Sequence, residues 1–302
     1  MPGHITGFHH ATMLAASARQ ADAFLREALG LGRVKTTVNR DEPDAYHLFH
    51  GAGAGAPGTL VTTAAFTNLP RGRAGVNEIA AVIFAVRRGT LPHWRDRLEA
   101  AGAPILGMSR VDNANRLWFE GPEGQTFALQ VCEDDPRVDA SGPPAVLGLH
   151  SFAVRLPGDE GFTDLLDHLG FDPVERSDGI ARFRLRGAGV PVEVEVESVP
   201  GGPDARSGAG TFHHVAFAVS DPGALGALRD ELVAAGQAPG PEIDGPYFRS
   251  VFLRAQGDIL IEFATPGPGL AADGEPGDRL ALPAEREGER TRLEGLLEPL
   301  DA

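Results

Sequence analysis

Short apolar strands and amphipathic helices alternate along this chain in a pattern that occurs four times. Each copy opens with an apolar strand, continues with a helix that ends near a glycine, and closes with further strands. Internal repetition of this kind fixes the architecture before any single motif is considered. The opening strands are predicted at 8–15, 78–86, 149–156 and 213–219. The helices are predicted at 18–29, 91–101, 162–169 and 221–235, and the last strands at 59–66, 126–132, 190–198 and 258–264.

Segments rich in glycine and proline separate the four copies at 70–75, 134–144 and 200–210. Such segments are typical of loops, and the middle one marks the main boundary. We therefore expect one pair of modules in residues 1–138 and a second pair in 145–268. Residues 269–302 form a tail with a short helix, which we expect to pack on the surface or on a second subunit.

Two histidine pairs and one glutamate interrupt the apolar pattern. His9 and His10 lie in the first opening strand, His213 and His214 in the fourth, and Glu262 in the last closing strand. A buried carboxylate without a partner is so unfavourable that it becomes protonated, and a bound cation removes that cost. Two histidines and one carboxylate are also the ligands of the facial triad, which leaves open positions on Fe(II).

The repeats allow an internal test of that metal site. When the four opening strands are superimposed, His10 and His214 occupy the same position. The corresponding positions elsewhere, in opening and closing strands, hold Glu78, Ser151, Thr62 and Gln130. Only copies one and four together supply two histidines and the carboxylate of Glu262. A shared metal therefore requires that copies one and four form one barrel, and that copies two and three form another without a complete triad.

Composition excludes several classes of function. The 302 residues carry a net charge of −15, which argues against binding to nucleic acids or to an anionic membrane surface. The single cysteine, Cys132, rules out an internal disulfide and suits a reducing cytoplasm. The N-terminal residues show no basic stretch followed by an apolar run, so we expect no signal peptide. The longest apolar run, Ile79–Val86, is too short for a membrane span.

The fourfold pattern resembles the vicinal oxygen chelate superfamily, with its paired βαβββ modules, over nearly the whole chain. It is most similar to the ring-cleaving dioxygenases that act on hydroquinones, often called glyoxalase-family proteins. The motifs that carry the resemblance are Gly7–His10, Lys35–Asn39, Asp44–Phe49, Pro70–Arg73, Phe212–Phe217, Tyr247–Phe252, Asp258–Glu262 and Pro266–Gly269. The fold implied is α+β, with four βαβββ modules that form two incomplete β-barrels and a C-terminal helical tail.

The resemblance implies roles for particular residues. His10, His214 and Glu262 would bind Fe(II), with Mn(II) as an alternative. At least one of His9 and His213 would do acid–base work beside the metal, although period-two alternation points both away from the ligands unless the strand bulges. In the resembling enzymes the tyrosine that matches Tyr247 lies by the metal and can bind a substrate hydroxyl. The family often has Asp-Arg shortly before that tyrosine, whereas this chain has Asp244-Gly245-Pro246, which makes the usual substrate preference doubtful.

The function that follows is ring cleavage by a non-haem Fe(II)-dependent dioxygenase in the cytoplasm. Its partners would be a hydroquinone- or catechol-type aromatic and O2, and we expect a homo-oligomer. One alternative is a glyoxalase-type isomerase, which generally uses four protein ligands, so Thr62 at the fourth position counts against it. A resistance transferase uses a triad but usually in a much shorter chain. A non-enzymatic small-molecule-binding protein would not need the metal.

Other polar residues are interpreted as structural or solvated. Glu193, Glu195 and Glu197 alternate along one strand and are expected to form a solvated face. Tyr46 and His47 are expected to be structural. The histidines expected to be exposed are His50, His93 and His168.

Overall fold

The computed structural model describes residues 3–111, 114–133, 135–137, 142–177 and 179–300, and contains four βαβββ modules. The first contains β1 (Ile5–Ala15), α1 (Ala18–Glu27), β2 (Gly32–Val38), β3 (Tyr46–Gly51) and β4 (Leu60–Ala65). The second contains β5 (Glu78–Arg87), α2 (Leu91–Ala100), β6 (Ile105–Val111), β7 (Ala114–Glu120) and β8 (Thr126–Cys132). The third contains β9 (Val146–Leu156), α3 (Glu160–His168), β10 (Phe171–Ser177), β11 (Ile180–Leu185) and β12 (Glu193–Ser198). The predicted fourfold repeat is confirmed.

The fourth module contains β13 (Phe212–Val219), α4 (Pro222–Ala234), β14 (Ile243–Asp244), β15 (Phe248–Arg254) and β16 (Leu260–Pro268). The tail adds β17 (Leu280–Ala281), a 3₁₀ turn at Ala284–Glu289 and α5 (Arg290–Leu296). β17 pairs with β2, so the tail packs on the first module of its own chain. Within the described residues, none of the helices has both the length and the apolar content needed to traverse a bilayer.

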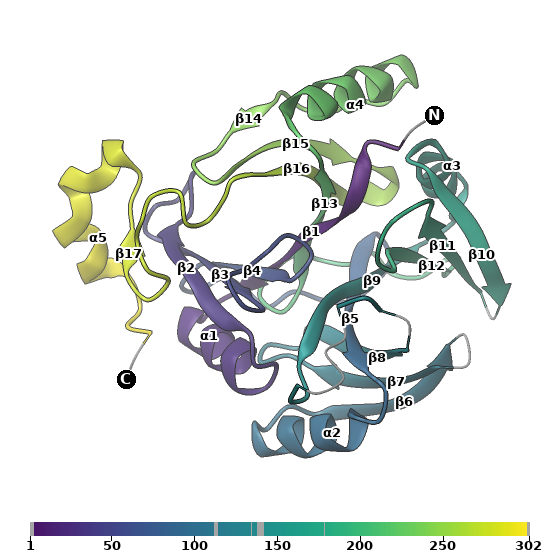
Figure 1. Cartoon of the computed structure of the whole chain (residues 1–302), viewed down its shortest axis with the longest axis horizontal. Helices are drawn as coiled ribbons and strands as arrows, with labels where there is room; N and C mark the ends of the chain where they lie inside the picture. Colours follow the sequence, from purple (N-terminus) through teal and green to yellow (C-terminus); the bar gives the residue numbers. More distant parts are fainter. Residues whose placement is uncertain (1–2, 112–113, 134, 138–141, 178, 301–302) are drawn as a thin grey trace.

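Two mixed sheets share the modules in the predicted way (Figure 1). One sheet has the strand order β14-β15-β16-β13-β1-β4-β3-β2-β17, and therefore combines modules one and four. The other has the order β10-β11-β12-β9-β5-β8-β7-β6, and combines modules two and three. Antiparallel pairing joins the modules at the centre of each sheet, between β1 and β13 and between β5 and β9. The prediction that copies one and four form one sheet is confirmed.

The sequence pattern missed four strands, β6, β10, β14 and β17. β6 and β10 form the edges of one sheet, and β14 and β17 form the edges of the other. β10 contains Pro173, and every one of its residues after Phe171 is exposed. Edge strands bury little apolar surface, so they leave little periodic signal, and proline within a strand further weakens it.

An aromatic cluster fixes the two sheets against each other. The ring of Phe8 on β1 stacks on Phe217 of β13 at 5.5 Å between centroids, and meets the edge of Phe152 on β9 at 6.1 Å. Phe152 lies 6.0 Å from Phe217. All three are buried and belong to one apolar cluster that extends through both sheets. Offset and edge-to-face contacts of this kind add about 0.5–1.5 kcal/mol each to the burial term.

The segments that connect the modules also pair with each other. Residues 70–76 lead from module one to module two, and residues 203–209 lead from module three to module four. Their backbones exchange hydrogen bonds, for example between Gly72 and Ala209 and between Arg73 and Arg206, both at 2.9 Å. A Cβ at Gly75 would lie 2.3 Å from the carbonyl oxygen of Pro203, so this close approach requires glycine. Two of the three predicted loops thus form a packed seam between the sheets, whereas residues 134 and 138–141 of the third lie outside the described residues.

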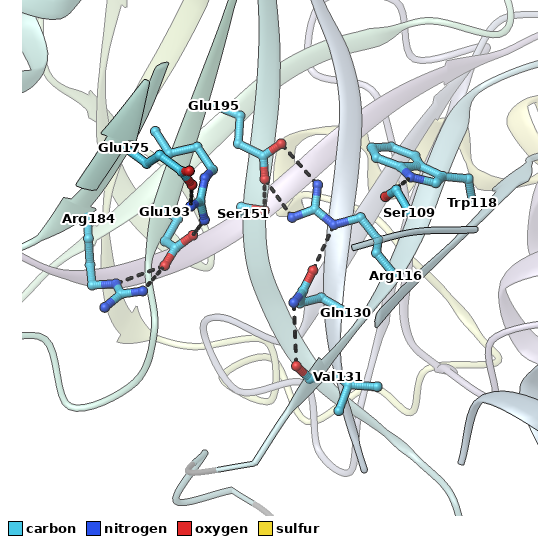
Figure 2. Close-up of polar contacts among 11 residues, drawn as sticks. Ser109, Arg116, Trp118, Gln130, Val131, Ser151, Glu175, Arg184, Glu193 and Glu195 are labelled. Atoms are coloured by element: carbon cyan, nitrogen blue, oxygen red, sulfur yellow. Dashed lines mark hydrogen bonds and ion pairs between the residues drawn. The ribbon is translucent and has the colours of Figure 1, made fainter. Parts of the chain in front are cut away.

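The second sheet holds a buried ion pair at the position that corresponds to the predicted metal site of the first sheet (Figure 2). Glu195 lies opposite Ala153, two residues after Ser151, just as Glu262 lies opposite Ala216, two residues after His214. Arg116 makes two hydrogen bonds to the Glu195 carboxylate, at 2.7 and 3.0 Å, and Ser151 donates a third at 3.2 Å. Arg116 is 1% exposed and Glu195 is 5% exposed. A guanidinium therefore neutralises the carboxylate in this sheet.

Two predictions about the second sheet are corrected. Glu193 and Glu195 are buried, not solvated, because arginines cover the face that they share: Arg184 donates to Glu193 at 2.8 Å. The position equivalent to His10 holds Ala81 and not Glu78, since His10 lies opposite Ala216 and Ala81 lies opposite Ala153. The register shift between Ile79 and Ala81 matches the one between Phe8 and His10 on β1, so the superposition by sequence is out of register by three residues. The same superposition places Gln130 at the position of Thr62, where the structure has Ala128, opposite Ile83.

Replacing Arg116 by methionine should leave the buried carboxylate of Glu195 without its charge partner. We expect Arg116→Met to lower the free energy of unfolding by about 3–5 kcal/mol, the cost of breaking a buried pair from one side. The double variant Arg116→Met with Glu195→Leu should recover most of that loss, because no charge remains buried. Urea unfolding followed by circular dichroism measures both values. A loss in the single variant of under about 1 kcal/mol, as for an exposed pair, would contradict this account.

Candidate metal centre

Two β-bulges build the histidine pairs. On β1, Phe8 lies opposite Phe217 and His10 opposite Ala216, so His9 is an extra residue without a partner on β13. On β13, His214 lies opposite Thr12 and Phe212 opposite Met13, so His213 is the extra residue there. A bulge changes the direction of its side chain relative to regular alternation. The exception expected for a bulge therefore applies to both His9 and His213, and each contacts the ligand histidine that follows it.

The three predicted ligands meet at one point. Nε2 of His10 lies 3.0 Å from Nε2 of His214, and the Glu262 Oε2 atom lies 3.1 Å from the first and 3.0 Å from the second. Three atoms at right angles around a cation, each at about 2.1 Å, would be roughly 3.0 Å apart. The triangle thus fits the facial arrangement of a divalent metal. Among the described residues, these three are the group of potential ligands that converges in this way.

Burial and charge make this group suited to a cation. All three ligand residues are buried, with exposures of 2%, 7% and 2% for His10, His214 and Glu262. Burial alone would raise the pKa of Glu262, but the charges and hydrogen bonds of His10 and His214 hold that pKa well below its usual range. The carboxylate is therefore ionised and faces two imidazole nitrogens, which is the donor set that a divalent metal accepts.

Each ligand histidine is held by the histidine before it. Nδ1 of His10 lies 2.8 Å from Nδ1 of His9, and Nδ1 of His214 lies 2.8 Å from Nδ1 of His213. With Nε2 directed at the centre of the triad, a neutral ligand imidazole carries its proton on Nδ1 and donates it to its neighbour. Such outer partners fix the orientation and tautomer of metal-binding histidines.

The two supporting histidines have different surroundings. His9 is 2% exposed and packs against the ring of Phe248 at 4.8 Å. Burial lowers the pKa of His9 to about 3, and the charge of His10 adds to this effect, so its imidazole is neutral. His213 is exposed and lines the cavity beside the triad. Only His213, of these two, faces both solvent and the cavity.

Threonines occupy the side of the site where a fourth ligand would stand. Thr62 lies opposite Thr12 of β1, and Thr12 is two residues after His10. In module four, Glu262 likewise lies opposite Ala216, two residues after His214, so Thr62 and Glu262 occupy equivalent positions. The Thr62 hydroxyl lies 2.7 Å from that of Thr12, whose oxygen is 2.9 Å from Nε2 of His214. The predicted equivalence of Thr62 and Glu262 is confirmed, and the site therefore has three strong ligands.

The triad opens into a cavity of about 1200 Å³. Its wall combines polar groups with the aromatic rings of Phe49, Tyr247, Phe248 and Phe252. Phe248 lies 5.6 Å from the ring of His10, and Phe252 lies 5.3 Å from the ring of His214. A metal bound by the triad would thus face a space with aromatic rings in its wall, which suits an aromatic ligand.

Tyr247 lines this cavity, and the tail positions it. Its hydroxyl donates to Asp273 at 3.0 Å, and Asp273 also accepts a hydrogen bond at 2.6 Å from Lys35, which is fully buried. Burial and the neighbouring Asp273 raise the pKa of the Tyr247 hydroxyl, which stays protonated. Gly269, at the end of the Pro266–Gly269 motif, donates its N–H to the Tyr247 carbonyl at 2.7 Å. That motif therefore holds the tyrosine in the cavity wall.

A cation from another segment stands beside Gly245. A Cβ at Gly245 would lie 3.9 Å from the guanidinium of Arg40 and only 2.7 Å from the Phe248 carbonyl oxygen. Arg40, which lines the cavity, donates to the Asp244 carbonyl at 3.4 Å. The cavity wall thus carries a positive charge at this point although the Asp244-Gly245-Pro246 segment has none.

Two histidines differ from their predicted roles or surroundings. His50 is fully buried and not exposed, because its Nε2 pairs with the buried carboxylate of Asp22 at 2.8 Å. His47, expected to be structural, lines the cavity, and its Nε2 has no hydrogen-bond partner among the described residues. The only sequence signal for His47 is its place in the Asp44–Phe49 motif. His93 and His168 are exposed, as predicted.

Comparison with known proteins agrees with this geometry. No family model matches the chain. The chain is 31% identical to the Bacillus subtilis protein named "Putative ring-cleaving dioxygenase MhqA", with 98% of this chain and 99% of the relative covered. It is 27% identical to the "Chlorohydroquinone/hydroquinone 1,2-dioxygenase" of Sphingobium indicum, with 97% and 96% covered. The chain belongs to the ring-cleaving dioxygenase family of the vicinal oxygen chelate superfamily.

Solved structures support the assignment at the level of the fold. The crystal structure of a "putative dioxygenase" from Bacillus subtilis superimposes with a TM-score of 0.91 at 26% identity, over 98% of both chains. Glyoxalase I from Zea mays superimposes with a TM-score of 0.64 at 14% identity, over 86% of this chain and 92% of that one. The second likeness shows only that ring-cleaving dioxygenases and glyoxalases share the fold.

Loss of one ligand should abolish tight metal binding in this ring-cleaving dioxygenase family member. His214→Ala removes one of three ligands, so its affinity should fall by more than the roughly 10–100-fold that follows the loss of an outer partner. Metal analysis after dialysis against a competing chelator measures this. His93→Ala, an exposed position on α2, is the matched control and should keep the wild-type metal content. Full metal content in His214→Ala would exclude the proposed ligand set.

Proposed function

We propose that this protein is a non-haem Fe(II)-dependent dioxygenase that cleaves the ring of a hydroquinone- or catechol-type aromatic. The observation that carries the proposal is a three-ligand site, with Thr62 in the fourth position, that opens into an aromatic-lined cavity. The similarity to a chlorohydroquinone/hydroquinone 1,2-dioxygenase over 97% of the chain supports it. Mn(II) accepts the same ligand types and is the alternative metal.

His10, His214 and Glu262 would hold the iron. When bound, Fe(II) would supply open positions for a substrate oxygen and for O2, and a path for electrons between the substrate and O2. With Glu262 bound to it, the ion would keep a single net positive charge. The flat walls formed by Phe248 and Phe252 would orient the aromatic ring next to these positions. Burial of the three ligands keeps bulk water away from this side of the cavity.

His213 is the residue best placed to move the substrate proton. It lines the cavity, it is exposed, and it contacts His214 through Nδ1, so its other ring nitrogen can exchange protons with solvent. His9 has the same relation to His10 but is buried and lies outside the set of residues that line the cavity. We therefore assign the acid–base role to His213 and an orienting role to His9.

Tyr247 would bind a substrate hydroxyl. Its own proton is committed to Asp273, so its oxygen lone pairs can accept a hydrogen bond from the substrate. The raised pKa of Tyr247 keeps it protonated, which suits this accepting and orienting role.

Oxygen uptake tests the proposal directly. The iron-loaded protein should consume O2 in the presence of hydroquinones or catechols and produce a ring-opened acid, followed with an oxygen electrode and by mass spectrometry. A metal-free sample is the control. If the loaded protein takes up no O2 with any such compound, yet isomerises a thiol adduct under anaerobic conditions, a glyoxalase-type isomerase is the correct function.

Two substitutions separate substrate binding from metal binding. Tyr247→Phe should leave the metal content nearly unchanged while turnover falls by perhaps 10²-fold, in the range of a lost acid–base or positioning group. Glu262→Gln should lower metal content and turnover together, because it removes the carboxylate charge from the triad. Metal analysis and oxygen uptake on the same samples give both values. Equal turnover in wild type and Tyr247→Phe would remove the tyrosine from the site.

A further inference from the structure

His47 lines the triad cavity, but its side chain has no assigned role in the candidate metal centre. It lies on β3, where it pairs with Ala64 of β4 on one side and with Thr37 of β2 on the other. Its ring packs against Phe49 at 4.4 Å between centroids. Both His47 and Phe49 line the cavity into which the triad opens, so they form part of one wall.

The Nε2 atom of His47 is buried and has no hydrogen-bond partner among the described residues. Buried polar atoms are rarely left without a partner, and those that are often mark the place of a ligand or a bound water. His50, on the same strand, also has one unpartnered buried nitrogen, Nδ1, but its Nε2 is held by Asp22 and it does not line the cavity. Among the described residues with a buried unpartnered side-chain atom, His47 is the one that lines the triad cavity. His47 is therefore arranged to receive a partner from the cavity.

His47 is near the triad but does not belong to it. It lies outside the group whose ligand atoms are within 4.8 Å of one another. Burial lowers the pKa of His47 to about 3, and the charges of His10 and His214 act in the same direction, which places it within their electrostatic reach. A cation at the triad would act in that direction too, so the imidazole is neutral. A neutral imidazole offers one N–H donor and one nitrogen acceptor.

We propose that His47 positions the substrate by a hydrogen bond between its Nε2 atom and a polar group on the part of the aromatic ring remote from the metal. This rests on the proposed function. A hydroxyl suits this position because it can both donate and accept, whichever tautomer His47 adopts. In a hydroquinone the second hydroxyl lies across the ring from the first, whereas in a catechol both lie on the same side. His47 therefore favours hydroquinones over catechols and over simple phenols.

Anaerobic binding tests the proposal without turnover. Calorimetric titration of the Mn(II)-loaded protein with hydroquinone, catechol and phenol gives three affinities, and the proposal expects hydroquinone to bind most tightly. His47→Phe keeps a flat ring but removes both nitrogens, so hydroquinone affinity should fall about five- to tenfold, the range of one neutral hydrogen bond. Affinity for phenol, which has no second hydroxyl, should stay the same. His47→Gln, which places an amide near the lost nitrogen, should restore part of the preference.

Controls separate a positioning role from a structural one. His93→Phe, at an exposed position, should leave all three affinities unchanged, and metal analysis should show that His47→Phe still binds Mn(II). Equal weakening of hydroquinone and phenol in His47→Phe, or an unchanged preference for hydroquinone, overturns the role of His47. In that case, oxygen uptake with hydroquinone by the iron-loaded wild type would still support the proposed function, because that measurement does not depend on the role of His47. Failure of the loaded wild type to bind any of the three compounds overturns both.

Discussion

The antiparallel pairing of β1 with β13 is the contact on which the candidate site depends. It joins residues about two hundred positions apart and sets His10 opposite Ala216 and Thr12 opposite His214. β16 then pairs in parallel with β13, which places Glu262 beside Ala216. Because the ligands come from the first and last modules, the triad requires contact between segments about two hundred residues apart. The aromatic contact of Phe8 with Phe152 and Phe217 couples this pairing to the second sheet.

The two sheets differ in the groups that surround a buried carboxylate. Both bury a carboxylate at the same register position, Glu262 in one sheet and Glu195 in the other. A buried charge needs a partner, and in the second sheet the guanidinium of Arg116 provides it from within the chain. In the first sheet, two imidazoles face the carboxylate instead, and the three side chains form a group that could hold a metal ion. The difference between a closed ion pair and an open metal site therefore lies in which side chains surround the carboxylate.

The sequence predicted the repeat, the pairing of modules and the converging triad, because buried strands and their embedded polar residues leave a strong periodic pattern. It missed β6, β10, β14 and β17, which are edge strands. It placed Glu193 and Glu195 in solvent, since alternation gives the face that residues share but not what covers that face. It did not identify His47 as part of the cavity wall, because the set of residues that line a cavity depends on how strands far apart in the sequence pair. Local pattern thus identifies candidate ligands better than the residues that shape the cavity around them.

The asymmetry of the candidate site comes from what surrounds two equivalent bulges. The bulges at His9 and His213 place each of these histidines 2.8 Å from the Nδ1 atom of the ligand that follows it, so both ligands are oriented in the same way. The surroundings then separate them: His9 packs under Phe248, whereas His213 reaches solvent. One side of the triad is thereby enclosed by an aromatic ring, and the other reaches solvent. The repeat thus supplies the two histidine positions, and differences between the modules decide which of the two supporting histidines is exposed.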